Sequence, residues 1–253
     1  MRVDNIHNHE AGFDATGIDS SGKKHILSDK SVYITGEENQ MNYVRVKPAS
    51  GDESYFYRNK VDKDQIVLHY TLGYLKGDIA TLTQHDYHVS VPFIIGRNGK
   101  IYNLFFSGYW AYHLGLGAVG GNKIKNQRTI GIELSNIGGL KKTDKGMTTF
   151  YTDIYCNNDQ TDYFKAQKFR RFDYYATYTD TQYKSLIILL RYLTARYNIE
   201  KKFLPEEDRY KTDRGVIDFG GIVSHVNYRQ SGKEDIGPAF DWNRIIQGVH
   251  EFL

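Results

Sequence analysis

Residues 89–104 read VSVPFIIGRNGKIYNL, two apolar segments on either side of a turn that contains Asn98 and Gly99. An Asn-Gly pair between apolar segments is the strongest short-range signal of a β-hairpin. Two more short apolar segments, QIVLHY at 65–70 and TIGIEL at 129–134, have the length and composition of buried strands. The middle of the chain therefore predicts a β-sheet that contains an antiparallel pair.

Two amphipathic helices are predicted in the C-terminal third. In residues 180–197 the apolar side chains recur at helical spacing and share one face: Tyr183, Leu186, Ile187, Leu190, Leu193 and Tyr197. Thr179 or Asp180 can cap this helix, and Asn198 is a typical stop. Residues 240–252 offer the second helix. Because helices alternate with strands, we expect an α/β fold with a mixed central β-sheet flanked by α-helices.

Two regions lack these strong patterns. Residues 1–60 are polar and predict an N-terminal extension with a few edge strands, in short alternating pieces at 31–35, 43–46 and 54–57. Its first residues, with His7 and His9, predict a solvated tail. Residues 148–178 are dense in Tyr, Phe, Asn and Asp and poor in Leu and Val, which is typical of an irregular surface insertion.

Composition narrows the function classes. The 253 residues are 40% hydrophobic and 25% charged, enough for a packed core, and a net charge of +3 does not favour nucleic acid or an anionic membrane as a partner. Cys156 is the only cysteine, so an intramolecular disulfide, a four-cysteine zinc site and an iron–sulfur cluster are excluded. Any metal must be held by histidine and carboxylate. The first ten residues lack the apolar segment of a Sec-type signal, and no aliphatic run approaches the ~18 residues that a transmembrane segment needs.

Three of the nine histidines stand where a side chain can face a cleft. His69 is near the end of an apolar strand, His113 precedes a glycine-rich loop, and His225 follows the apolar residues 220–224. For any one of them alone, a hydrogen-bonded structural histidine is the more frequent explanation. A catalytic zinc would take ligands from distant parts of the chain and keep one position open for water.

The stretch HVNYRQSGKEDIGPAFDW at 225–242 resembles the end of the zinc-dependent N-acetylmuramoyl-L-alanine amidase family, whose fold is shared with peptidoglycan recognition proteins and phage amidase-type lysozymes. Other segments resemble the family in the same order. They are VLHYT at 67–71, the hairpin at 89–102, YHLG at 112–115, TIGIEL at 129–134 and the helix at 179–197. The resemblance covers about residues 64–252, so we expect a catalytic domain at 61–253. It leaves residues 1–60 and a Tyr-rich insertion at about 136–178 unexplained.

The resemblance implies a site for one Zn²⁺ ion. Its ligands would be His69, His225 and Asp235, with a fourth position left for water. Glu133 would be the general base, and Lys233 would stabilise the oxyanion. Each residue has an alternative explanation: Asp235 as a turn or cap residue before Gly237 and Pro238, and Lys233 as an exposed loop lysine. Taken alone, Glu133 would more often be one partner of a surface ion pair, but its place in the TIGIEL segment favours the catalytic role.

The resemblance also implies substrate contacts. We expect them at His113, which the family places beside the cleft, at Trp110 and at Phe93. Phe93 stands where relatives often carry a tyrosine, so catalysis would depend on Glu133 rather than on a phenol. The tyrosines of the insertion could stack on sugar rings or cover a small core of their own.

The implied function is hydrolysis of the amide bond between N-acetylmuramic acid and L-alanine in peptidoglycan. Peptidoglycan or a muropeptide would be the partner, and the chain, made in the cytoplasm, would act after lysis or delivery, as a phage endolysin does. One alternative is a peptidoglycan sensor that kept the cleft and lost turnover. Another is a structural virion component, which the N-terminal extension would suit. Nothing in the sequence specifies an oligomeric state.

Overall fold

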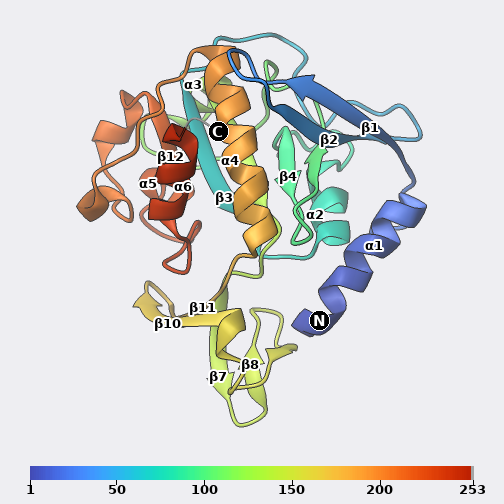
Figure 1. The fold of residues 1–253 in the computed structure, drawn as a ribbon, viewed down its shortest axis with the longest axis vertical. Helices are drawn as coiled ribbons and strands as arrows, with labels where there is room; N and C mark the ends of the chain where they lie inside the picture. Colours follow the sequence, from blue (N-terminus) through green and yellow to red (C-terminus); the bar gives the residue numbers. More distant parts are fainter. Residues whose placement is uncertain (252–253) are drawn as a thin grey trace.

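The computed structural model describes residues 1–251 and confirms a mixed α/β architecture (Figure 1). Its main sheet has seven strands in the order β1-β2-β5-β4-β6-β3-β12. These are β1 (His25–Tyr33), β2 (Gln40–Pro48), β3 (Gln65–Tyr70), β4 (Phe93–Ile95), β5 (Ile101–Asn103), β6 (Thr129–Leu134) and β12 (Gly221–Ser224). Because β3 is parallel to both β6 and β12, the carboxyl ends of these three strands meet at one edge of the sheet.

Helices pack on both faces of this sheet. On one face, α4 (Asp180–Tyr197) and α6 (Trp242–His250) enclose a core that includes Leu68 and Leu190. On the other face, α1 (Ile6–Thr16) and α2 (Leu75–Leu82) enclose a second core. Successive side chains of β4 alternate between the two, so that Phe93 packs in the α4 core and Ile94 in the α2 core. The remaining α-helices are α3 (Asn122–Arg128) and α5 (His225–Tyr228).

Both predicted helices are confirmed, the first at the predicted residues. Thr179 forms a capping box with Gln182, in which the Thr179 hydroxyl accepts the backbone N–H of Gln182 at 3.1 Å and the Gln182 side chain accepts the backbone N–H of Thr179 at 3.1 Å. Asn198 ends α4 in the left-handed conformation with φ 52°. The second helix begins at Trp242 rather than at residue 240 because Asp241 is its N-cap, and residue 252 of the predicted range lies outside the described residues.

The first residues differ from the prediction. They form α1 rather than a solvated tail, and His7 and His9 lie in this helix. The helix is fixed by the buried side chain of Glu10, which accepts the backbone N–H groups of Arg97 and Asn98 at 2.7 and 2.8 Å in the β4–β5 turn. Sequence inspection missed α1 because its apolar positions are few.

Two of the three predicted strand pieces in the N-terminal extension form strands. β1 and β2 form an antiparallel hairpin, and β2 pairs with β5, so the N-terminal residues extend the main sheet. The third predicted piece, residues 54–57, forms a single bridge between Tyr57 and Trp110 instead of a strand. Within residues 1–251, no helix has the length and apolar character that crossing a membrane requires.

The Tyr-rich insertion is a second sheet rather than an irregular segment. Its five strands have the order β10-β11-β7-β8-β9. They are β7 (Gly139–Thr143), β8 (Gly146–Thr148), β9 (Ile154–Cys156), β10 (Phe164–Phe169) and β11 (Phe172–Ala176). Figure 1 shows this sheet in yellow-green below the main body. Leu140, Met147, Tyr155 and Cys156 are fully buried in a separate core, to which Val3 and Ile6 near the N-terminus also contribute. A subsidiary core therefore accounts for part of the aromatic content.

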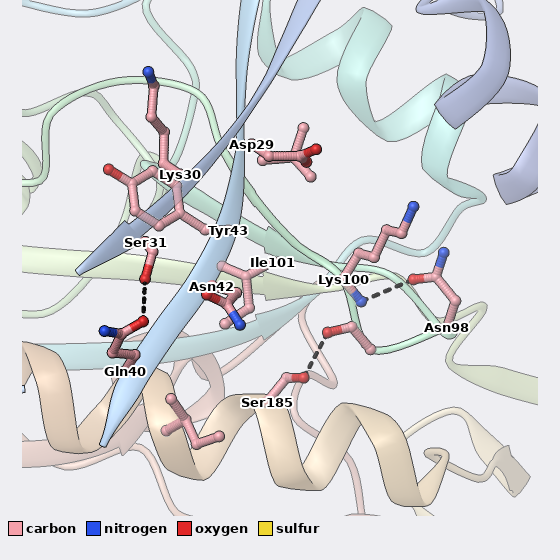
Figure 2. A pocket seen from close by; sticks show the side chains of 13 residues that line it. Asp29, Lys30, Ser31, Gln40, Asn42, Tyr43, Asn98, Lys100, Ile101 and Ser185 are labelled. Atoms are coloured by element: carbon pink, nitrogen blue, oxygen red, sulfur yellow. Dashed lines mark hydrogen bonds between the residues drawn. The ribbon is translucent and has the colours of Figure 1, made fainter. Parts of the chain in front are cut away.

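A cavity of about 670 Å³ lies between the β1–β2 hairpin, the β4–β5 turn and α4 (Figure 2). Polar side chains such as Asn42 and Ser185 line it, and the hydroxyl of Ser31 in its wall donates to the Gln40 side chain at 2.8 Å. The residues predicted for metal binding, catalysis and substrate contact lie outside its lining. This cavity is therefore not where the chemistry was expected.

Candidate metal centre

The three predicted ligands meet at the carboxyl ends of β3 and β12. His69 is the penultimate residue of β3, His225 is the first residue of α5 directly after β12, and Asp235 lies in the loop that follows α5. One ligand atom from each residue lies within 4.8 Å of the others. The two histidines are 156 positions apart in the chain, and the parallel pairing of β12 with β3 brings them together.

Local contacts hold His225 and Asp235 together. Ser224 and Asn227 form a capping box at the start of α5, which fixes the turn from strand to helix. The backbone N–H of Val226 donates to the carbonyl of Asp235 at 2.9 Å. The loop therefore returns to the same turn from which His225 projects.

A series of hydrogen bonds assigns the tautomer of His69. The Thr129 hydroxyl donates to the carbonyl of Lys125 at 2.8 Å, so it must accept from Nε2 of His113, also at 2.8 Å. Burial lowers the pKa of His113 well below its ordinary value, so the ring is neutral and its Nδ1 is an acceptor. This Nδ1 accepts from Nε2 of His69 at 2.9 Å. Nδ1 of His69 is therefore left with a free lone pair.

The second histidine is arranged in the same way. Nε2 of His225 donates to the backbone carbonyl of Leu114 at 2.9 Å, which leaves its Nδ1 as an acceptor. The two Nδ1 atoms of His69 and His225 are 2.9 Å apart. Oδ2 of Asp235 lies 3.2 Å from the first and 2.9 Å from the second.

The protonation states of these groups favour the binding of a cation. Burial, reinforced by His225, lowers the pKa of His69 to about 4, so the ring is neutral at pH 7. The Asp235 carboxyl group is also buried, and its Oδ2 lies within 3.2 Å of both Nδ1 atoms. Three buried acceptors then face one another without a proton between them, an arrangement that a metal ion stabilises. Two imidazole nitrogens and one carboxylate oxygen fit a single divalent ion.

Glu133 stands beside this group. It pairs in register with His69 across β6 and β3, so the two side chains leave the same face of the sheet. Its Oε2 is buried and has no hydrogen-bond partner among the described residues. Burial, followed by the charge of Asp235, raises the pKa of Glu133 well above its ordinary value, and Lys233 opposes this shift. A carboxyl group in this setting can accept and return a proton.

A cavity of about 430 Å³ adjoins Glu133. Its walls include His9 of α1, Asp78 of α2 and Tyr151 of the insertion. The N-terminal region and the insertion therefore both line the space next to the candidate base.

Lys233 lies two residues before Asp235 in the loop after α5. Its positive charge acts on both Glu133 and His69, which places its ammonium group within electrostatic range of the centre. The structure thus brings five predicted residues to one edge of the sheet.

The predicted substrate contacts have structural roles of their own. Both ring nitrogens of His113 are engaged, with His69 and with Thr129, so His113 orients a predicted metal ligand, and its contact with substrate stays a prediction. Phe93 is 3% exposed in the α4 core. It pairs with Ile132, the residue before Glu133, and a shift of one position in a strand places a side chain on the opposite face.

Trp110 also has a structural role. It is 4% exposed, stacks on Tyr57 with ring centroids 4.1 Å apart, and donates from Nε1 to the side chain of Asn59 at 2.6 Å. These contacts attach the segment before β3 to the rest of the domain, so the buried side chain of Trp110 is not available for the predicted substrate contact.

Sequence inspection also missed residues that support the centre. Thr129, which fixes the tautomer, begins the strand that was singled out only for Glu133. Gly131 of the same strand makes room for His113, since a Cβ there would lie 3.0 Å from Cγ of that ring and 2.6 Å from Cγ1 of Val91. The glycine in the TIGIEL segment was the signal, because a glycine inside a buried strand marks a close approach.

Comparison with known proteins agrees with this geometry. The sequence model of a family described as N-acetylmuramoyl-L-alanine amidase matches residues 58–238. The curated protein N-acetylmuramoyl-L-alanine amidase AmiD of Escherichia coli is 29% identical over 187 residues, which are 72% of this chain and 51% of AmiD. The chain thus spans about half the length of that relative.

Similar solved structures include two complexes. One is AmiD from E. coli with the substrate anhydro-N-acetylmuramic acid-L-Ala-D-gamma-Glu-L-Lys, at 24% identity and a TM-score of 0.47, covering 86% of this chain and 65% of that one. The other is AmpDH3 from Pseudomonas aeruginosa with anhydromuramic pentapeptide, at 19% identity and a TM-score of 0.47, covering 76% of this chain and 61% of that one.

Proposed function

Since the chain belongs to the N-acetylmuramoyl-L-alanine amidase family, we propose that it is a zinc-dependent enzyme that hydrolyses the amide bond between N-acetylmuramic acid and L-alanine in peptidoglycan. The observation that carries the proposal is the buried group of His69, His225 and Asp235, whose three acceptor atoms face one another. The name of the curated relative supports the reaction.

The ligand residues hold the metal in a defined state. His69 and His225 present Nδ1 because their Nε2 protons are committed to His113 and to the Leu114 carbonyl. Asp235 supplies a negative charge that favours a cation over a proton. Zn²⁺ bound there would supply a Lewis acid that polarises an amide carbonyl and makes water more acidic.

Glu133 and Lys233 supply the remaining chemistry. Glu133 takes the proton of the attacking water and returns it to the leaving amine, which its raised pKa favours. Lys233 places a positive charge where the carbonyl oxygen becomes negative. Removal of one group that stabilises an oxyanion typically lowers kcat by a factor of about 10²–10³.

The test is release of free stem peptide from purified sacculi. We expect release by the zinc-loaded protein, loss of release with a chelator, and recovery when Zn²⁺ is returned. Glu133→Gln should abolish release and still bind zinc, whereas His69→Ala should lose the metal. Release that is unaffected by both the chelator and Glu133→Gln would refute the proposal. Binding of sacculi by the zinc-loaded wild type without release would instead favour the sensor.

We further propose that the protein meets its substrate in the cell wall after lysis or delivery. The metal centre is chemically suited to peptidoglycan whichever route brings the protein there. Addition of the purified protein to cells from outside and to permeabilised cells separates the routes. Lysis that requires permeabilisation would support action from within.

A further inference from the structure

The loop after α5 carries two of the five residues proposed for chemistry, yet residues 229–238 contain no helix or strand. Asp235 and Lys233 both belong to it. Its backbone must therefore be held by contacts from elsewhere if Asp235 is to face the two histidines reproducibly. In addition to the contact of Asp235 with Val226, the β10–β11 hairpin of the insertion, which the family resemblance did not explain, supplies several such contacts.

Arg170, at the turn between β10 and β11, binds the loop backbone at two points. Its Nη2 donates to the carbonyl of Arg229 at 2.8 Å, and its Nη1 donates to the carbonyl of Lys233. A single guanidinium thus connects the start of the loop with the residue two positions before Asp235. A planar group with several fixed donors is suited to such a bridge.

Arg171 binds the next residue of the loop. Its Nε donates to Oε1 of Glu234 at 2.6 Å and its Nη2 to Oε2 at 3.0 Å. The Glu234 side chain is only 6% exposed, so this bidentate pair is largely removed from solvent on the acidic side. Two parallel hydrogen bonds fix orientation as well as distance. Glu234 lies between Lys233 and Asp235, so the pair acts directly on the backbone that presents both.

Two more contacts follow Asp235. The Tyr178 hydroxyl, just after β11, donates to the carbonyl of Ile236 at 2.7 Å. Nζ of Lys165 in β10 donates to the carbonyl of Pro238 at 3.0 Å. The hairpin and the residues beside it therefore hold the loop on both sides of the metal ligand.

We propose that Arg170 and Arg171 are positioning residues for the metal centre and that the insertion is a working part of the site. They set the loop so that Asp235 meets the two histidines and Lys233 stays near Glu133. The proposal rests on the proposed function for the identity of the metal. It concerns residues outside the group of predicted metal ligands.

The experiment measures the Zn²⁺ dissociation constant by competition with a chromophoric chelator. Arg171→Gln removes the bidentate pair, and the sheet of the insertion should remain folded. We expect its zinc Kd to rise by about 10- to 100-fold, the usual effect of removing a group that orients a metal ligand. Lys168→Ala is the matched control, because Lys168 lies on the same hairpin, is 80% exposed and is paired only with exposed Asp173 at 3.9 Å. Its zinc Kd should equal that of the wild type.

A second measurement separates positioning from general stability. Hydrogen exchange of the metal-free proteins should become faster in residues 229–238 of Arg171→Gln while α4 keeps its protection. Arg171→Lys, which keeps the charge but not the bidentate geometry, should give an intermediate zinc Kd. If Arg171→Gln does not fold, Arg170→Gln and Arg171→Lys provide the same comparison.

The outcomes are distinct. A wild type that binds no zinc would refute the proposed function. A wild type that binds zinc, with Arg171→Gln and Arg170→Gln within twofold of it and of Lys168→Ala, would overturn only the positioning role. A rise in zinc Kd with faster exchange confined to the loop would support it.

Discussion

Thr129→Val should weaken zinc binding although Thr129 contacts neither the metal nor a ligand of the metal. The hydroxyl accepts the Nε2 proton of His113, and His113 in turn accepts the Nε2 proton of His69. Valine has nearly the same shape and offers no acceptor. The change therefore breaks the series of hydrogen bonds at its far end with little effect on packing.

The magnitude follows from the group left unpaired. A buried N–H without an acceptor costs about 1–3 kcal/mol. His113 can avoid that cost by moving its proton to Nδ1, but this atom faces Nε2 of His69 at 2.9 Å. His69 must then carry its own proton on Nδ1, which Zn²⁺ would have to displace. A cost of about 1–3 kcal/mol corresponds to a zinc Kd about 5- to 150-fold higher.

The assay is zinc competition with a chelator, with Thr129→Ser as the matched control. Serine keeps the hydroxyl and loses a methyl group, so it should lower the free energy of unfolding without changing the zinc Kd. Nitrogen chemical shifts of the ring in the metal-free protein should report a change of His69 tautomer in Thr129→Val alone. Equal zinc Kd values for the valine and serine variants would refute the tautomer assignment.

Three further predictions concern stability. Gly131→Ala should lower the free energy of unfolding by about 1–3 kcal/mol, since its Cβ would lie 3.0 Å from His113. Gly77→Ala in α2 is the control and should be neutral or stabilising, because the nearest neighbour of its Cβ lies at 3.8 Å. Equal free energies of the two variants in urea unfolding would contradict this. Thr179→Ala should cost about 1 kcal/mol through loss of the α4 capping box, and an unchanged Tm would argue against it. Burial raises the pKa of Asp78 to about 7, so its proton stabilises the folded state at low pH and this contribution is lost as pH rises through 7. The free energy of unfolding of Asp78→Asn, relative to that of wild type, should therefore increase by about 3 kcal/mol from pH 5 to pH 8. A difference that does not depend on pH would refute this prediction.

The strands and helices around the centre could be predicted because their signals are local. Short apolar segments, an Asn-Gly turn and a cap at Thr179 each specify structure within a few residues. The ligand set was predicted for another reason. The segment at 225–242 resembled a known family, whereas spacing alone could not show that His69 and His225 meet.

The errors have a shared physical origin. Phe93 and Trp110 were assigned from the family resemblance, but the face of β4 on which Phe93 lies depends on register, which only the paired strands determine, and Trp110 is buried by contacts with Tyr57 and Asn59. The insertion was taken as irregular because its strands are short and rich in polar residues, and its core forms only when they pair. The roles of Thr129 and Arg171 depend on partners far along the chain, and no local pattern reports them.

The distance along the chain between the ligands has a consequence for folding. Asp235 is 166 positions from His69, and an unfolded chain gathers such distant groups only against a large loss of loop entropy. The pairing of β3 with β12 must therefore be complete before the ion can be held tightly. A nascent, misfolded or proteolysed molecule would lack the intact centre. The proposed amidase activity would therefore arise only in correctly folded molecules.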